Sequence, residues 1–163
     1  MNFRPNNYLL IVLLISYCST FSIKGPARVV DGDTIIINEI LIRLEGIDAP
    51  EVDQLCEEKE IGQLSINYLT DLIANSEIEC LLGKNDKFGR LLATCFKDDQ
   101  NINSNLVLTG HAFVDRLYNK KYLDEEELAM KNNTPIWMYK CLEPYVHRVR
   151  KNRGKYSKKR VEY

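Results

Sequence analysis

Three short segments bring together residue types that phosphate chemistry requires: carboxylates, arginines and glycine-containing turns. They are Asp31–Thr34 (DGDT), Arg43–Glu51 (RLEGIDAPE) and Asp86–Arg90 (DKFGR). Carboxylate oxygens bind hard cations, and planar guanidinium groups bind phosphate oxygens in pairs. A further carboxylate near such a site can accept a proton from water. The combination is typical of metal-assisted phosphodiester hydrolysis.

The first two segments lie among short β-type runs. The expected strands cover residues 28–30, 34–37 and 40–44. Asn38-Glu39 predicts a two-residue reversal between the second and the third. In the third, Ile40, Ile42 and Leu44 alternate onto one face, which places Arg43 on the other. An isolated arginine usually serves in a salt bridge, but this one interrupts an apolar strand beside two acidic segments.

Three helices are predicted: the first from its apolar periodicity, the second from its end at the breaker Gly110, and the third from acidic residues at its start and Lys131 near its end. The predicted helices cover residues 57–75, 105–109 and 123–131, and a second hairpin is predicted from 78–82, the turn 83–89 and 91–96. In the first helix, Ile61, Leu64, Tyr68 and Leu72 recur at spacings of three and four. Several strands with interspersed helices indicate the α+β class, with a small barrel that carries helices on its outside.

The charges are distributed unevenly along the 163 residues. Residues 1–144 carry 14 Lys or Arg against 22 Asp or Glu, a net charge of -8, whereas residues 145–163 carry 8 against 1, a net charge of +7. We therefore expect a basic tail over 143–163, which offers contacts to phosphates. The alternatives are a disordered solubilising tail and attraction to an anionic surface.

An apolar run at Tyr8–Ile15 follows Arg4. It predicts a signal peptide over residues 1–22, cleaved after Ser22 or after Ala27, or else an uncleaved membrane anchor. The protein is then secreted or periplasmic, or held at a membrane.

Export would favour disulfides. Four cysteines follow the apolar run: Cys56, Cys80, Cys95 and Cys141. Their even number indicates two disulfides, and four free buried thiols are the alternative. Cys80 and Cys95 flank the second hairpin turn and are the favoured pair, which leaves Cys56 with Cys141 by elimination.

Taken together, these motifs resemble the staphylococcal nuclease (thermonuclease) family. The resemblance runs from about Ala27 to Trp137, and we place the corresponding domain at 26–142. Its motifs keep the family's order and nearly its spacing: DGDT, Arg43, Asp48–Glu51, DKFGR, Asn105-Leu106-Val107, Gly110 and Ile136-Trp137. The resemblance implies a five-stranded OB-fold β-barrel with three helices. It also implies a calcium-dependent nuclease that acts on DNA and RNA and leaves 3′-phosphate ends, and we expect a monomer.

The resemblance also implies a role for each site residue. Asp33, Asp48 and the backbone carbonyl of Ala49 would bind Ca²⁺, and Asp31 would tune the ion without touching it. Arg43 and Arg90 would clamp the scissile phosphate. Glu51 would activate or position the attacking water.

The predicted substrate contacts are Lys87, Arg116 and Tyr118. The chain departs from the family here, because Phe88 stands where tyrosine is common and Arg116 lies near a position where a stacking tyrosine can occur. Arginine also stacks on bases, so we expect the chemistry to survive while affinity and nucleotide preference change. A non-catalytic OB-type binding module is the rival interpretation, but such a module has no need of the complete site. His111 and His147 receive no catalytic role.

Overall fold

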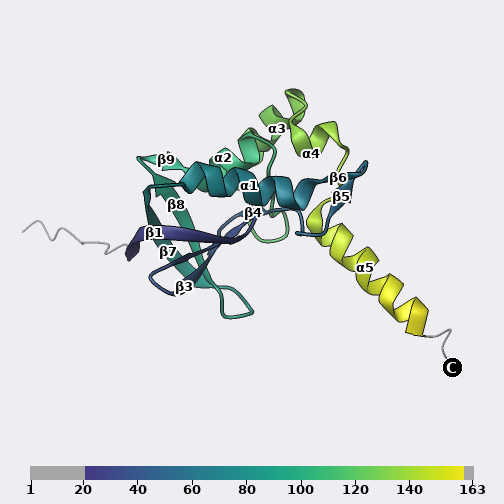
Figure 1. Ribbon diagram of the computed structural model, residues 1–163, viewed down its shortest axis with the longest axis horizontal. Helices are drawn as coiled ribbons and strands as arrows, with labels where there is room; N and C mark the ends of the chain where they lie inside the picture. The colour runs from purple at the N-terminus through teal and green to yellow at the C-terminus, as the bar shows by residue number, and fades with distance from the viewer. Residues whose placement is uncertain (1–20, 160–163) are drawn as a thin grey trace, which may run out of the picture.

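Five strands close into a barrel at the centre of the molecule (Figure 1). In the computed structural model, which describes residues 21–159, these strands are β1 (Ser22–Asp31), β2 (Thr34–Ile37), β3 (Ile40–Leu44), β7 (Glu77–Asn85) and β8 (Leu91–Lys97). They pair antiparallel in the order β3-β2-β1-β7-β8, and a parallel pairing of β3 with β8 closes the ring. The predicted five-stranded OB-type barrel of the α+β class is confirmed.

The first hairpins form where the sequence predicts them. Asn38 and Glu39 have φ of 49° and 64°, the left-handed pair that a two-residue β-turn requires. This turn sets Ile37 opposite Ile40. Ile42 and Leu44 are fully buried as expected, whereas Ile40, which directly follows the turn, is 43% exposed.

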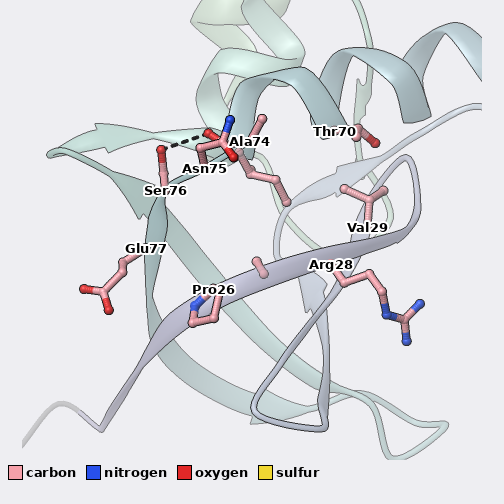
Figure 2. Close-up of a pocket in the computed structure, with 10 residues that line it drawn as sticks. Pro26, Arg28, Val29, Thr70, Ala74, Asn75, Ser76 and Glu77 are labelled. Carbon is pink, nitrogen blue, oxygen red and sulfur yellow. Dashed lines mark hydrogen bonds between the residues drawn. The ribbon is translucent and has the colours of Figure 1, made fainter.

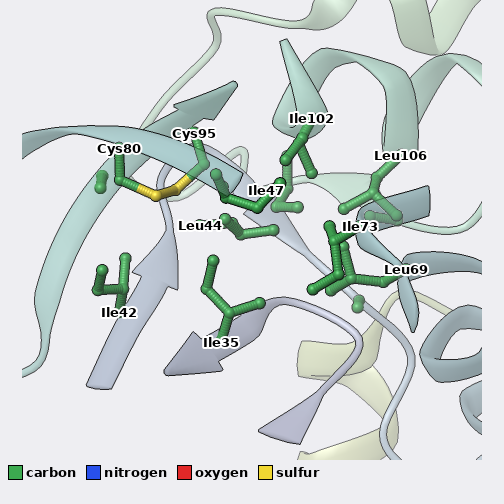
Figure 3. Packing of buried hydrophobic residues seen from close by; sticks show 14 of the residues in the cluster. Ile35, Ile42, Leu44, Ile47, Leu69, Ile73, Cys80, Cys95, Ile102 and Leu106 are labelled. Carbon is green, nitrogen blue, oxygen red and sulfur yellow. A yellow bond between two sulfur atoms is a disulfide. The ribbon is translucent and has the colours of Figure 1, made fainter. Parts of the chain in front are cut away.

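Alternating apolar side chains fill the barrel (Figure 3). Ile35, Ile42 and Leu44 point inward from one side, and Leu69 and Ile73 of a helix cover the end of the barrel. A disulfide joins Cys80 of β7 to Cys95 of β8, which face each other in register within this core. Burying each such isoleucine or leucine contributes about 1.5–3 kcal/mol to folding, and the packing fixes the strands whose ends carry the site.

Five helices lie outside the barrel in the described part of the chain: α1 (Ile61–Ile73), α2 (Ile102–Leu108), α3 (Leu123–Lys131), α4 (Pro135–Met138) and α5 (Pro144–Lys159). The first three correspond to the three predicted helices. α2 begins earlier than expected because the side chain of Asn101 caps it, accepting from the backbone N–H of Ser104 at 3.0 Å. α4 and α5 are additional.

The prediction of one helix over 57–75 is wrong at its start. Residues 55–60 form a small hairpin instead, made of β5 (Leu55–Cys56) and β6 (Lys59–Glu60). Glu57 and Glu58 form its turn with φ of 47° and 68°, so they do not lie in the first helical turn. Two further short pieces complete the fold: β4 (Ile47–Asp48) pairs with β10 (Phe113–Val114), and β9 (Gln100–Asn101) extends β8.

The fold begins before residue 26. Residues Ser22 to Pro26 of β1 pair with β7, so cleavage after Ala27 would remove this pairing. Both cleavage sites stay predictions. The apolar run Tyr8–Ile15 lies outside the described residues. Among the helices of residues 21–159, none combines the length and the apolar character needed to cross a membrane.

As far as the structure describes it, the basic segment forms a helix, α5 (Pro144–Lys159). Its sequence shows little apolar periodicity, and its contacts with the domain include the ion pairs of Arg148 with Asp48 and of Lys151 with Asp53. α5 starts beside the β5–β6 hairpin and extends away from the barrel (Figure 1). A disulfide between Cys56 and Cys141 ties the segment before α5 to this hairpin. The two disulfides are thus the two expected pairs.

Candidate active site

The turn between β1 and β2 positions the first two carboxylates. The backbone N–H of Asp33 donates to Oδ1 of Asp31 at 3.1 Å, and Oδ2 of Asp33 accepts from the backbone N–H of Ala49 at 2.9 Å. A Cβ on Gly32 would lie 2.7 Å from the Cβ of Ala49, so only glycine permits this close approach. The first two sequence motifs therefore meet although 16 residues separate Asp33 from Ala49.

Arg43 lies between two buried carboxylates. The pairing of β2 with β3 sets Arg43 opposite Thr34, next to Asp33. The guanidinium donates through Nη1 to Oδ1 of Asp33, and through Nη2 to Oδ1 of Asp48 at 3.0 Å. Its side chain is only 13% exposed. The residue predicted as a phosphate clamp is thus bound to both predicted metal ligands.

The carboxylates crowd one another electrostatically. Burial is the main cause that raises the pKa of Asp33 to about 7; the charges of Asp31 and Asp48 act in the same direction, and Arg43 opposes them. The combined negative charge of Asp31, Asp33 and Asp48 is thus larger than the single positive charge of Arg43.

Glu51 reaches the same place from the loop after β4. The guanidinium of Arg148 donates through Nη1 to Oε1 of Glu51 at 2.7 Å and to Oδ1 of Asp48 at 3.2 Å. Its Nη2 donates to Oδ2 of Asp48 at 2.9 Å. One arginine of α5 therefore bridges the predicted metal ligand and the predicted water-activating glutamate.

The turn Asp86–Arg90 is organised by its own aspartate. Oδ1 of Asp86 accepts from the backbone N–H groups of Phe88 and Arg90 at 2.8 and 2.9 Å, and Oδ2 accepts from Nε of Arg90 at 2.7 Å. Desolvation opposes these bonds, but together they hold the pKa of the Asp86 carboxyl below its ordinary value.

Arg90 directly precedes β8, the strand that pairs with β3. β8 pairs Leu92 with Arg43, so Arg90 lies two residues along the chain from the partner of Arg43. Within the described residues, however, the ion pair of Arg90 is with Asp86 and not with the carboxylates of the site. Its joint action with Arg43 stays a prediction.

Exposed aromatic and basic side chains gather beside this turn. Phe88 and Tyr118 are 73% and 70% exposed. Nζ of Lys87 donates to the hydroxyl of Tyr118 at 3.0 Å and lies 5.1 Å from the ring centre of Phe88. Such a surface can stack on bases and contact a phosphate.

Arg116 has a structural partner. Its guanidinium pairs with the buried carboxylate of Glu126, which also accepts from the backbone N–H of Val114 at 2.9 Å. Glu126 of α3 thus contacts both Val114 of β10 and Arg116, which follows β10. Its predicted contact with substrate stays a prediction.

Two residues near the site escaped the sequence analysis. Arg148 is one of eight basic residues in 145–163, and nothing in the sequence distinguishes it from the other seven. Asp115 directly follows β10, which pairs with β4 and so brings it near Asp48. Burial and the charge of Asp48 raise the pKa of Asp115. The pairing of two very short strands is not visible in the sequence.

The histidines lie outside this cluster. His111 is buried, stacks on Tyr68 with ring centres 3.8 Å apart, and has its pKa lowered by burial to about 4. His147 of α5 lies 3.8 Å from Asp53.

A surface groove lies between β1 and the end of α1 (Figure 2). Pro26, Arg28 and Glu77 line it together with Ala74–Ser76, where the hydroxyl of Ser76 donates to the carbonyl of Ala74 at 3.2 Å. None of the predicted site residues lines this groove in the part of the chain that the structure describes. The groove therefore offers no chemistry to compare with the carboxylate cluster.

The carboxylates fit a hard divalent cation by their chemistry. Asp33 and Asp48 offer oxygen donors, and oxygen is the ligand that Ca²⁺ prefers. Within residues 21–159 no three His, Cys, Asp or Glu side chains are grouped as a metal site. The ligand set that the resemblance implies has only two such side chains and a backbone carbonyl, so it stays a prediction.

Comparisons with known proteins identify a matching family and several relatives. The family described as "Staphylococcal nuclease homologue" matches residues 41–139. An uncharacterized endonuclease of Haemophilus influenzae is 33% identical over 139 residues, which cover 79% of this chain and 74% of that protein. A thermonuclease of Staphylococcus intermedius is 28% identical over 153 residues, covering 78% and 90%.

A third relative has a different name. "Succinoglycan biosynthesis protein ExoI" of Rhizobium meliloti is 34% identical over 124 residues, which cover 71% of this chain and 64% of that protein. The chain thus spans only part of the length of this relative.

Proposed function

The chain belongs to the staphylococcal nuclease family, and on that premise we propose that it is an exported, calcium-dependent nuclease that cleaves DNA and RNA. The observation that carries the proposal is the direct contact of Arg43 with both Asp33 and Asp48, with Glu51 held beside Asp48. These residue types suit phosphodiester hydrolysis, and they come from two of the three sequence segments, Asp31–Thr34 and Arg43–Glu51. A module that only binds nucleic acid would have no use for their convergence.

Each residue then has a chemical task. Asp33, Asp48 and the carbonyl of Ala49 would hold Ca²⁺, with Asp31 supporting them. Bound there, the ion would act as a Lewis acid toward the phosphate oxygens. Arg43 and Arg90 would neutralise the charge that builds on the phosphate, and one well-placed donor of this kind is worth about 10²–10³ in rate.

Glu51 would take the proton of the attacking water. The water oxygen forms a bond to phosphorus, the bond from phosphorus to the 5′ oxygen breaks, and that oxygen takes up a proton. The products are a 3′-phosphate and a 5′-hydroxyl.

Substrate binding would use the exposed surface beside the turn Asp86–Arg90. Lys87 would contact a flanking phosphate, and Tyr118 and Phe88 would stack on bases. Two disulfides and the apolar run Tyr8–Ile15 support export, because disulfides persist in oxidising compartments. We expect the nuclease to act as a monomer.

The test is digestion of plasmid and single-stranded DNA by residues 21–163 in Ca²⁺, Mg²⁺ or EDTA, with Glu51→Gln beside the natural sequence. We expect cleavage only with Ca²⁺ and a loss of about 10²-fold or more in Glu51→Gln. Glu79→Gln is the matched control, since Glu79 is exposed on β7. End labelling of the products would identify the 3′-phosphate. DNA that is bound but left intact under every metal would instead support the binding module.

A further inference from the structure

Both carboxylate oxygens of Asp48 accept hydrogen bonds from arginine side chains. Arg148 donates to Oδ2 at 2.9 Å and to Oδ1 at 3.2 Å, and Arg43 also donates to Oδ1 at 3.0 Å. Asp48 is 7% exposed, so few other donors can reach it. A cation that binds Asp48 must therefore take an oxygen that an arginine now holds.

The two arginines are held to different degrees. Arg43 is 13% exposed and is fixed by Asp33 and by the carbonyl of Ile47 as well. Arg148 is 42% exposed and reaches inward from the surface helix α5. Of the two, Arg148 can turn away into solvent without disturbing the barrel.

α5 can stay in place while Arg148 moves. The helix is anchored through the disulfide Cys56–Cys141 and through the carbonyl of Leu142, which accepts from Gln54 at 2.8 Å. On the same side of α5, Lys151 pairs with Asp53. Release of the Arg148 side chain therefore requires rotamer changes only.

Arg148 and a divalent cation exclude one another at Asp48. Both are positive and both need the same oxygens, and a guanidinium stays protonated at any ordinary pH, so deprotonation cannot relieve the conflict. Release of Arg148 from Asp48 also breaks its hydrogen bond to Oε1 of Glu51, which is 2.7 Å long.

We propose that Arg148 is an internal competitor for the metal at Asp48, and that it sets the affinity of the site for a divalent cation. This inference rests on the proposed function, because it takes Asp48 as a metal ligand. It assigns to α5 a part in the site that is separate from binding nucleic acid.

The test is calorimetric titration of CaCl₂ into residues 21–163 without nucleic acid. Arg148→Gln removes the charge and keeps a polar side chain, so we expect Ca²⁺ to bind about tenfold or more tightly than to the natural sequence. Arg148→Lys keeps the charge but cannot bridge both carboxylates, so its affinity should lie between the two. Arg150→Gln makes the same charge change at an exposed position of the same helix and should shift the affinity by about twofold at most.

Each result decides between the possibilities, with thermal melts as the check on folding. Tighter binding in Arg148→Gln alone supports the competitor, even if binding to the natural sequence is too weak to measure. Equal or weaker binding in Arg148→Gln overturns it and leaves the proposed function standing. If neither protein binds Ca²⁺, both the inference and the proposed metal site fail.

Discussion

At the residue scale, two arginines that lie far apart in the sequence form ion pairs with the acidic cluster. Arg43 of β3 serves Asp33 and Asp48, and Arg148 of α5 serves Asp48 and Glu51. Asp48 is therefore the shared member through which a change at either arginine reaches the other. Removing one partner of a buried ion pair leaves an uncompensated charge, so the effects of substitutions here will not add.

A second residue-scale feature concerns acid stability. Burial lowers the pKa of His111 to about 4, whereas an unfolded histidine titrates near 6.5. Between these values the unfolded chain binds more protons than the folded one, so His111 favours unfolding as the pH falls from 6.5 toward 4. The free energy of unfolding thereby falls by up to roughly 3 kcal/mol between pH ~6.5 and pH ~4, and this stability is fully present above pH ~6.5.

We therefore predict that His111→Phe, which keeps a ring against Tyr68, loses less stability on acidification than the natural sequence. The measurement is the free energy of unfolding in urea at pH 4.5 and 7.5. The raised pKa of Asp33 acts in the opposite direction in both proteins, so the difference between their pH slopes isolates His111. Identical slopes would contradict the prediction, because they would show that His111 has the same pKa in the folded protein as in the unfolded chain, about 6.5.

At the element scale, α1 supports the loop that carries Glu51. Gly62 lies in the first turn of α1, and a Cβ there would come 1.8 Å from the carbonyl oxygen of Glu51. The backbone N–H of Gly62 also donates to the carbonyl of Gln54 at 3.4 Å. The start of the helix thus fixes where the loop can pass.

We predict that Gly62→Ala lowers both activity and stability. In most helices this change stabilises by about 0.5–1 kcal/mol, but here the added methyl must displace backbone beside Glu51. We expect a loss of about 1–3 kcal/mol in unfolding free energy and a fall in kcat without a matching change in Ca²⁺ affinity. Gln63→Ala, exposed one residue along, is the control. A stabilised and fully active Gly62→Ala would show that the loop does not depend on this contact.

The sequence predicted the features that depend on neighbouring residues, and it missed those that depend on contacts between distant parts of the chain. The Asn38-Glu39 reversal depends on neighbouring residues, and the α3 boundaries at Leu123 and Lys131 were predicted correctly from local charge and breakers. α5 was missed because its contacts are ion pairs with a loop about a hundred residues away, which leave no apolar period. The hairpin at Glu57-Glu58 was mistaken for helix, since both residues adopt left-handed backbone without being glycine.

The same reasoning applies to the site. Asp33, Asp48 and Glu51 lie in recognisable motifs, and the structure brings them together as the motifs imply. Arg148 has no motif, because its role depends on where a disulfide and a helix place it. Sequence patterns identified the residues, and only the fold reveals their partners.

At the scale of the whole molecule, closure of the barrel depends on β1. This strand pairs with β2 through its second half and with β7 through its first half, Ser22 to Pro26. β1 thus joins the hairpin that carries Asp33 and Arg43 to the hairpin that carries Arg90. Loss of its first half would open the barrel between β1 and β7.

We predict that residues 21–163 unfold cooperatively on heating, whereas residues 27–163 do not. The shorter chain leaves the edge of β7 unpaired along five residues and exposes the core around Ile78. Circular dichroism melts of the two proteins provide the measurement. Equal melting temperatures would place the start of the folded domain after Pro26.

The disulfide between Cys56 and Cys141 encloses most of the domain in one covalent loop, with a sequence separation of 85. The turn with Lys87 and Arg90 lies inside that loop and also inside the loop closed by Cys80 and Cys95. Phe88 at its tip is largely exposed, which makes the turn a natural target for proteases that cut after basic residues. A single nick there would leave both fragments joined through two crosslinks, with α5 still attached to the hairpin that precedes α1.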